Sequence, residues 1–423
     1  MYLTDRSASP GAETGQGRRR GAGPRVAPVV LVLGAVSLIT DISSEMVTAV
    51  LPLYLVTNLG FSPLGFGTLD GVYNGVSALV QLTGGHLADR IRNHKLLAGL
   101  GYGLSALCKP LLLLASSIGA FGTVLAMERI GKGLRTAPRD AMISLSTPPE
   151  NQGRAFGVHR AMDTTGAMLG PLTAFLILRA AADGYDAVFG VSGCVAALGV
   201  LVLVLFVPRG QRAAQTDEAG APDGGQPVRV RQALALLRLP RLRALAGCAA
   251  LLGLTTVSDA FVYLLLQRRA GIGEQWFTLL PLGTAVVFLL LAVPVGALAD
   301  RAGRRTVFLA GHVGLLTAYA LLLWAPATPV LPFLVLALHG TFYAATDGVL
   351  PAALAGIVPE QLRASGLAIV GTGQALARFC CSLGFGAAWT VWGDGPALAG
   401  SAVGLLCCAA VAGLVLRPAG GTR

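Results

Sequence analysis

The sequence predicts an all-α integral membrane protein whose twelve transmembrane helices form two bundles of six. Of its 423 residues, 54% are hydrophobic and only 13% are charged, whereas soluble domains carry roughly 25% charged residues. Mean hydropathy is +0.68. Apolar runs of about 20 residues, the length of helix that crosses a bilayer, recur along the whole chain. The two halves of the chain also repeat each other's short motifs.

The N-terminal residues 1–26 are expected to form a disordered cytoplasmic tail, because Gly, Ser, Ala and Arg dominate them. A signal peptide is the competing interpretation, with "RRRGAGPR" as its basic region and "VAPVVLVLGAV" as its apolar region. No A-x-A-like cleavage site follows, and the apolar run continues as a full span, so we prefer the tail.

The expected spans are 27–57, 64–87, 96–117, 119–138, 154–178, 187–207, 242–267, 275–298, 306–325, 330–355, 364–391 and 396–416. The first six would form an N-terminal bundle, 27–207, and the last six a C-terminal bundle, 242–417. Residues 208–241 are rich in Pro, Gly and Ala and read as a cytoplasmic linker. Residues 418–423 would be a short tail.

Basic residues gather in the loops expected on one face, and only Arg179, Arg268 and Arg269 fall in the opposite loops. The positive-inside rule then places both termini in the cytoplasm of a multi-pass protein of the bacterial inner membrane. The same bias explains the net charge of +11, so no nucleic-acid partner is expected. The seven cysteines lie in apolar runs without metal-ligand spacing and are expected to pack rather than pair. No cofactor or metal is expected.

The clearest repeat is "GGHLADRIRNHK" after the second span, which "VGALADRAGRR" answers after the eighth. Asp41 in the first span likewise answers Asp259 in the seventh. Parallel repeats of six spans imply two bundles related by an axis along the membrane normal.

These loops resemble the signature loop of the major facilitator superfamily, and the chain resembles that superfamily over nearly its whole length after residue 26. The residues concerned are Gly85, Asp89, Arg90 and Arg92 in the first copy, and Gly296, Asp300, Arg301 and Arg304 in the second. The resemblance implies that these residues form part of a gate. It implies the same for Asp140 and Asp347, at the inner ends of spans four and ten, since a carboxylate there contacts the basic loop.

Two further stretches resemble motifs of proton-coupled drug antiporters. "ERIGKGLRTAPRD" in the fourth span matches one motif through Arg129, Gly133 and Ala137, and "GAMLGP" in the fifth matches the start of another through Gly166, Gly170 and Pro171. The chain also resembles a poorly characterised prokaryotic branch of the superfamily, which supplies no substrate.

Several spans carry polar side chains at helical spacing. A carboxylate at the bilayer centre costs ~2.5–3.5 kcal/mol even on insertion scales, so each one needs a partner, a wet cavity or a function. Four such stripes in the first half suggest a shared polar cavity. The candidates for proton coupling and substrate binding are Asp41, Glu45, Asp70, Asn74, Arg129, Lys132, His159, Asp163 and Asp259.

Asp41 and Glu45, one helical turn apart, are the strongest candidates for carrying a proton, because coupling requires a carboxylate that titrates near neutral pH. We expect Arg129 to approach this pair in one state and to withdraw in the other. The structural alternative is that the charges form buried ion pairs that fix helix packing, such as Glu128 with Lys132 and His159 with Asp163.

The sequence therefore predicts a secondary active transporter that moves a small organic molecule, such as a drug or natural product, by proton-coupled efflux. Its partners would be the substrate, protons and membrane lipid, and it would act as a monomer. An importer or uniporter of the same fold is the main alternative. A non-transporting receptor is disfavoured by the buried charges. An intramembrane enzyme is disfavoured because no H-E-x-x-H or suitable G-x-S-x-G motif occurs, and an ATP-driven pump because no P-loop occurs.

Overall fold

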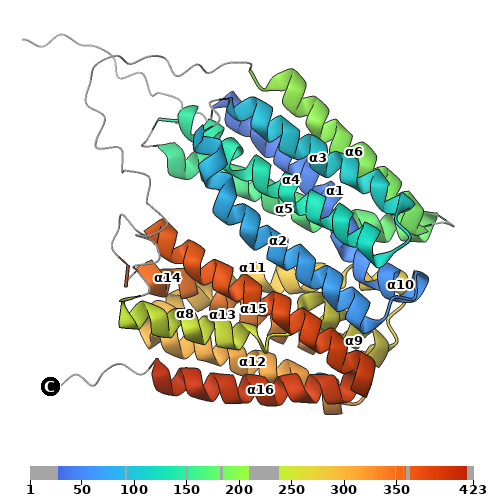
Figure 1. Cartoon of the computed structure of the whole chain (residues 1–423), viewed down its shortest axis with the longest axis vertical. Coiled ribbons are helices and arrows are strands. Elements are labelled where there is room, and N and C mark those ends of the chain that lie inside the picture. The colour runs from blue at the N-terminus through green and yellow to red at the C-terminus, as the bar shows by residue number, and fades with distance from the viewer. Residues whose placement is uncertain are drawn as a thin grey trace, which may run out of the picture.

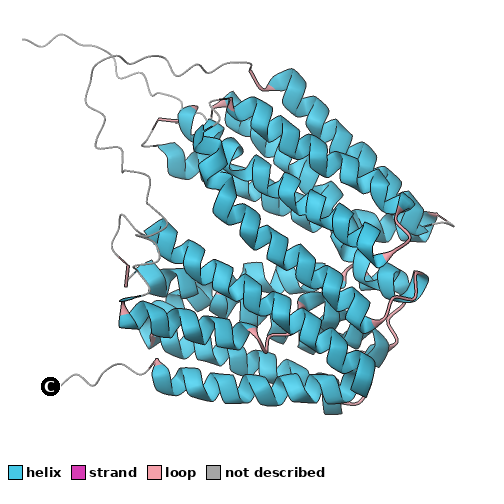
Figure 2. Cartoon of the chain, in the orientation of Figure 1, coloured by secondary structure: helices cyan, strands magenta, loops and turns pink. Residues whose placement is uncertain are grey.

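The computed structural model describes residues 27–90, 93–148, 151–181, 184–208, 238–347, 349–355, 357–358 and 363–416. Every element within these ranges is a helix, so the predicted all-α membrane fold is confirmed (Figures 1 and 2). The expected tails, 1–26 and 418–423, and most of the expected linker lie outside the described residues.

The first half contains α1 (Pro28–Leu53), its π-helical continuation η1 (Tyr54–Asn58), α2 (Pro63–Arg90), α3 (His94–Leu114), α4 (Ile118–Leu145), α5 (Gln152–Ala180) and α6 (Gly184–Phe206). Polar side chains cap the helices that begin after short loops. Asn93 accepts a hydrogen bond from the Leu96 N–H of α3 at 3.1 Å, and Ser117 accepts one from the Ala120 N–H of α4 at 3.2 Å. α1 packs against α5 and α6, and α4 packs against α2 and α3.

The second half contains α8 (Pro240–Gly253), α9 (Asp259–Ala270), α10 (Glu274–Phe277), α11 (Leu280–Ala302), α12 (Arg304–Trp324), α13 (Leu331–Thr346), α14 (Val349–Ala355), α15 (Arg363–Trp392) and α16 (Asp394–Val415). Within the described residues, seven helical segments are long and apolar enough to cross a membrane on composition alone. The remaining expected spans carry more polar residues or are interrupted.

The seventh span, expected to be continuous over 242–267, is broken between α8 and α9 at residues 254–258. The Thr255 and Thr256 hydroxyls donate to the Leu252 carbonyl at 3.0 and 2.9 Å, and the Val257 N–H donates to the Tyr319 hydroxyl at 2.8 Å. A helix can break inside a membrane only where the freed backbone groups find such partners. The partner comes from α12, so hydropathy along the seventh span could not reveal the break. The tenth expected span is likewise divided into α13 and α14.

The helices gather into two groups, α1–α6 and α8–α16, which splay apart toward one side in Figure 1. α6 ends and α8 begins on that side, which we call the linker face; the opposite side is the far face. α2 and α15 lie side by side and diverge toward the linker face (Figure 1). Near the far face they are so close that a Cβ on Gly67 would lie 2.4 Å from the Ser382 carbonyl oxygen. Small residues permit such close packing in lipid.

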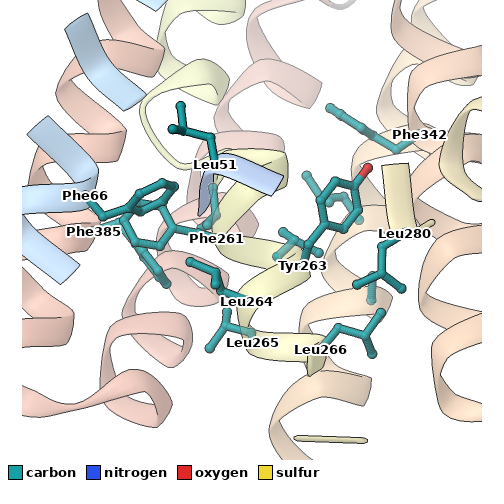
Figure 3. Close-up of a cluster of buried hydrophobic side chains, with 14 of the residues drawn as sticks. Leu51, Phe66, Phe261, Tyr263, Leu264, Leu265, Leu266, Leu280, Phe342 and Phe385 are labelled. Atoms are coloured by element: carbon teal, nitrogen blue, oxygen red, sulfur yellow. The ribbon is translucent and has the colours of Figure 1, made fainter. Parts of the chain in front are cut away.

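Aromatic side chains from both groups meet in one buried cluster (Figure 3). The Phe261 ring of α9 lies 4.9 Å from the Phe66 ring of α2 and 4.9 Å from the Phe385 ring of α15, measured between centroids, both edge-on. Leu51 of α1 joins the same cluster. These contacts hold the two groups of helices together near the far face.

Candidate functional site

A row of charged side chains on α4 contacts four other helices of the first half, α1, α2, α3 and α5. Lys132 lies 3.9 Å from the Glu45 carboxylate of α1, and Arg135 lies 3.2 Å from the Asp41 carboxylate one turn along. The Asp41–Arg135 pair is buried, with 10% and 3% of the side chains exposed, whereas Glu45 and Lys132 are 26% and 34% exposed. The two carboxylates that the sequence singled out therefore sit in different environments.

In the state that this structure shows, the partner of Asp41 is Arg135 and not Arg129. Residues six apart on a helix point about 120° apart, so the two guanidiniums cannot serve the same carboxylate. Arg129 donates to Glu128 at 2.6 Å and stacks on the Tyr73 ring of α2 at 3.9 Å. Arg135 stacks on the Tyr102 ring of α3 at 4.5 Å.

The structural alternative paired Glu128 with Lys132, whereas the structure pairs Glu128 with Lys109 and Arg129. Lys109 of α3 lies 3.4 Å from Glu128, and both side chains are almost fully buried. Sequence reasoning missed Lys109, although a lysine within an apolar span is itself a signal for a buried partner. Lys132 is thereby left to contact Glu45.

Toward the linker face the polar row continues through Arg139. Its guanidinium lies 3.0 Å from Asp140 and 3.7 Å from Asp163 of α5, and it donates to the Ser37 hydroxyl at 3.3 Å. His159 bonds to Ser37 at 3.0 Å, so its expected pairing with Asp163 is not formed. The described charges of the first half thus form four separate groups of ion pairs, which link α4 to α1, α3 and α5.

The antiporter-like glycines of α5 set the distance between α5 and α1. A Cβ on Gly166 would lie 2.4 Å from the Leu38 carbonyl oxygen, and one on Gly170 would lie 2.6 Å from the Glu45 Cβ. Pro171 follows as a buried residue of the same helix. This contact fixes the position of Glu45 on α1.

Replacing Gly170 with Ala is expected to destabilise the protein by about 1–3 kcal/mol, because the added methyl group overpacks the α1–α5 contact. Gly157→Ala is a matched control in the same helix, since a Cβ there meets nothing within 4 Å. The control should be neutral or stabilising by up to about 1 kcal/mol. Thermal unfolding of both variants in detergent measures the difference, and equal stabilities would contradict the overpacking argument.

A cavity of about 360 Å³ lies between the two groups of helices. The first half contributes Glu45, Asp70, Tyr73 and Asn74 to its wall, and the second half contributes Ser258, Asp259, Tyr263, Tyr343, Asp347 and Arg378. Asp41 does not line it. Of the pair singled out from the sequence, only Glu45 faces the space between the bundles.

Two carboxylates of the cavity wall already have close partners. The Ser382 hydroxyl of α15 donates to Asp70 of α2 at 2.5 Å, which joins the two halves. Asp259 accepts a hydrogen bond from the Tyr343 hydroxyl at 2.6 Å and lies 3.2 Å from His339. The sequence around Tyr343 and Ser382 shows no pattern that would predict these contacts.

The expected gate residues lie at the linker face. In the second copy, Gly296 and Asp300 lie in α11, Arg301 lies in its last turn, and Asp300 contacts Arg304 of α12 at 3.4 Å. Asp347 ends α13 and lines the cavity. Gly85, Asp89 and Arg90 lie at the end of α2, but their side chains, and all of Arg92, lie outside the described residues.

The family model of the Major Facilitator Superfamily matches residues 33–380. The chain belongs to this superfamily. That membership confirms the resemblance seen in the sequence, and it makes the protein a membrane transporter by family and fold. An uncharacterized MFS-type transporter of Methanocaldococcus jannaschii is 29% identical over 89% of this chain and 92% of its own length. An uncharacterized protein of Mycobacterium tuberculosis is 33% identical over 38% of this chain and 39% of its own length.

Solved structures of other superfamily members share the fold. The nucleoside transporter NupG superposes with a TM-score of 0.77 at 14% identity, covering 92% of this chain and all of that one. A bacterial homologue of the human lysosomal transporter Spinster, in an inward-facing and unoccupied conformation, superposes with a TM-score of 0.74 at 16% identity, covering 93% and 98%. At these identities the likeness establishes the fold alone.

Proposed function

We propose that this superfamily transporter moves a small organic molecule across the cytoplasmic membrane by alternating access, exchanging it for protons in the direction of efflux. The observation that carries the proposal is the cavity between the two halves, because its wall is built by charged side chains from both. Moving one half against the other would change the side of the membrane to which the cavity opens.

The contacts between the halves favour a state that is closed at the far face. Beyond the aromatic cluster, the Tyr185 hydroxyl of α6 donates to Glu274 of α10 at 2.9 Å, and the Leu64 N–H of α2 donates to the Thr390 hydroxyl of α15 at 3.0 Å. Toward the linker face, α2 and α15 diverge (Figure 1). With the linker in the cytoplasm, as the positive-inside pattern indicates, this is an inward-facing state.

Glu45 is the residue best placed to exchange a proton for substrate. It lines the cavity, and its ionic partner among the described residues, Lys132, lies at the long distance of 3.9 Å. Its 26% exposed side chain is accessible to water and ligand, whereas the buried Asp41 is held by Arg135. The resemblance of α4 and α5 to antiporter motifs supports the direction of efflux.

The test is proton release in proteoliposomes that contain the purified protein and an internal pH-sensitive dye. A panel of hydrophobic cations, antibiotics, sugars, organic acids and amino acids is added in turn. We expect at least one compound to dissipate an imposed pH gradient in protein-containing vesicles but not in empty ones. An Asp394→Asn variant, changed at an exposed carboxylate at the start of α16, should behave as wild type. Uptake of a compound without any proton signal would instead indicate a uniporter.

Replacing Tyr185 with Phe removes the hydrogen bond to Glu274 that joins the halves at the far face. A neutral donor to a charged acceptor contributes about 1.5–3 kcal/mol at most, and less where water can replace it. We expect the variant to populate the outward-open state more, so that a single cysteine at Asn58, in a background without the native cysteines, reacts faster with a membrane-impermeant maleimide added at the far face. An unchanged labelling rate would show that Tyr185 does not hold the far face closed.

A further inference from the structure

Arg378 of α15 is a charged residue of the cavity wall that has no ion-pair partner within the described part of the chain. It lines both the central cavity and a neighbouring one of about 150 Å³ in the second half. Among the described residues, no carboxylate oxygen lies within 4.0 Å of its guanidinium nitrogens, the distance that defines an ion pair. An arginine at membrane depth is costly unless an anion or water solvates it.

Two of the three carboxylates near Arg378 are held by other groups. Asp70, Asp259 and Asp347 all lie within electrostatic range of the guanidinium. However, Asp70 is bonded to Ser382, and Asp259 is bonded to Tyr343 and lies against His339. Arg378 lines both cavities, and among the described residues its guanidinium has no hydrogen-bond or ion-pair acceptor. The five donors of a guanidinium lie in a planar arrangement that suits a carboxylate or phosphate.

The rest of the cavity wall has the opposite charge. Four carboxyl-bearing residues line it, Glu45, Asp70, Asp259 and Asp347, against the single guanidinium of Arg378. A ligand with only an anionic group would be repelled by these carboxylates. A ligand with only a cationic group would leave Arg378 without a partner and would be repelled by it.

We propose that the substrate is amphoteric: its carboxylate or phosphate binds Arg378, and its amine or other cationic group binds at Glu45. This inference rests on the proposed transport function and names its substrate class. Glu45 lies on α1 and Arg378 on α15, so such a ligand contacts both halves at once. Tyr73, Tyr263, Phe277 and Phe288 line the same cavity and supply apolar surface for the body of the ligand.

Ligand-induced thermal stabilisation of the purified protein in detergent tests this without requiring transport. The probes are a library of amino acids and dipeptides, each also supplied as its C-terminal amide and as its N-acetyl derivative. The amide keeps only the cationic group and the N-acetyl derivative keeps only the anionic group. We expect stabilisation by uncapped members of the library, with at least a tenfold weaker response to both capped forms.

Arg378→Gln should abolish the response to the uncapped probes, and Arg378→Lys should retain part of it, because lysine keeps the charge but loses the bidentate geometry. Arg243→Gln, at an exposed arginine of α8, is the control and should respond as wild type. The inference is overturned if no probe stabilises the protein, if the amides act as strongly as the uncapped compounds, or if Arg378→Gln still responds.

Failure of this inference is distinguishable from failure of the proposed function. If proteoliposomes transport other compounds and Arg378→Gln transports them equally well, the substrate class is wrong and the transport function stands. If uncapped probes bind through Arg378 but no compound crosses the membrane or moves protons, the site stands and the proposed transport function fails.

Discussion

Replacing Asp41 with Asn is expected to lower the free energy of unfolding by about 3–5 kcal/mol, because it leaves Arg135 charged and buried without its partner. Only 3% of the Arg135 side chain is exposed, and its contact with Asp41 is 3.2 Å long. The Tyr102 ring on which Arg135 stacks supplies only part of the lost attraction. Denaturation of the detergent-solubilised variant, followed by circular dichroism, measures the loss.

The double variant Asp41→Leu with Arg135→Met separates the structural role of this pair from a role in coupling. Replacing both charges with apolar groups of similar volume is often neutral or stabilising, so the double variant should recover most of the stability. It can then be tested for proton exchange. If it is stable and still couples, Asp41 serves packing alone; if it is stable and uncoupled, Asp41 also carries protons. Wild-type stability in Asp41→Asn itself would contradict the buried-pair argument.

Replacing Glu45 with Gln is expected to abolish substrate-driven proton release while leaving the protein folded. The amide keeps the size and the hydrogen-bonding capacity of the side chain but cannot exchange a proton, and the lost contact with Lys132 is long and partly exposed. Partly exposed pairs contribute about 0–1 kcal/mol to stability, so folding should be nearly unaffected. The measurement is the proteoliposome pH assay with any compound that gives a signal in wild type.

Lys132→Met is the matched control for Glu45→Gln, because it removes the same ion pair but keeps the carboxylate. We expect it to retain proton release. A Glu45→Gln variant that still releases protons with substrate would remove Glu45 from the coupling mechanism. Loss of signal in both variants would instead assign the effect to the ion pair.

Much of the fold could be predicted from the sequence because it depends on properties that are local or repeated. Hydropathy over about 20 residues reports what a bilayer requires of a helix, and the two copies of the loop at Asp89 and Asp300 report the internal repeat. The break between α8 and α9 could not be predicted in this way, since the Tyr319 hydroxyl that supports it lies more than 60 residues away in the chain. An even longer separation in the chain hides the close approach of Gly67 to Ser382.

The candidate site was predictable in its residue types but not in its pairings. The cost of charge in a membrane marked Asp41, Glu45, Lys132 and Asp259 for attention. Which cation meets which carboxylate depends on the rotation of α4 relative to α1 and α3, so the sequence suggested Arg129 where Arg135 makes the contact. The isolation of Arg378 is likewise visible only when the partners of Asp70 and Asp259 are known.

By itself, then, the sequence determined that this protein is a polytopic helical membrane protein with two related halves and an unusual number of charges inside its spans. These features follow from the free energy of transferring each residue between water and lipid, which depends on residue type and local order. The tertiary structure alone decided that Asp41 is buried in an ion pair while Glu45 lines the cavity. It also decided that Arg378 lines the same cavity with no ion-pair partner among the residues that the structure describes. Those outcomes depend on distances of a few ångströms between helices that are far apart in the chain. The energy of an ionic contact depends on such distances.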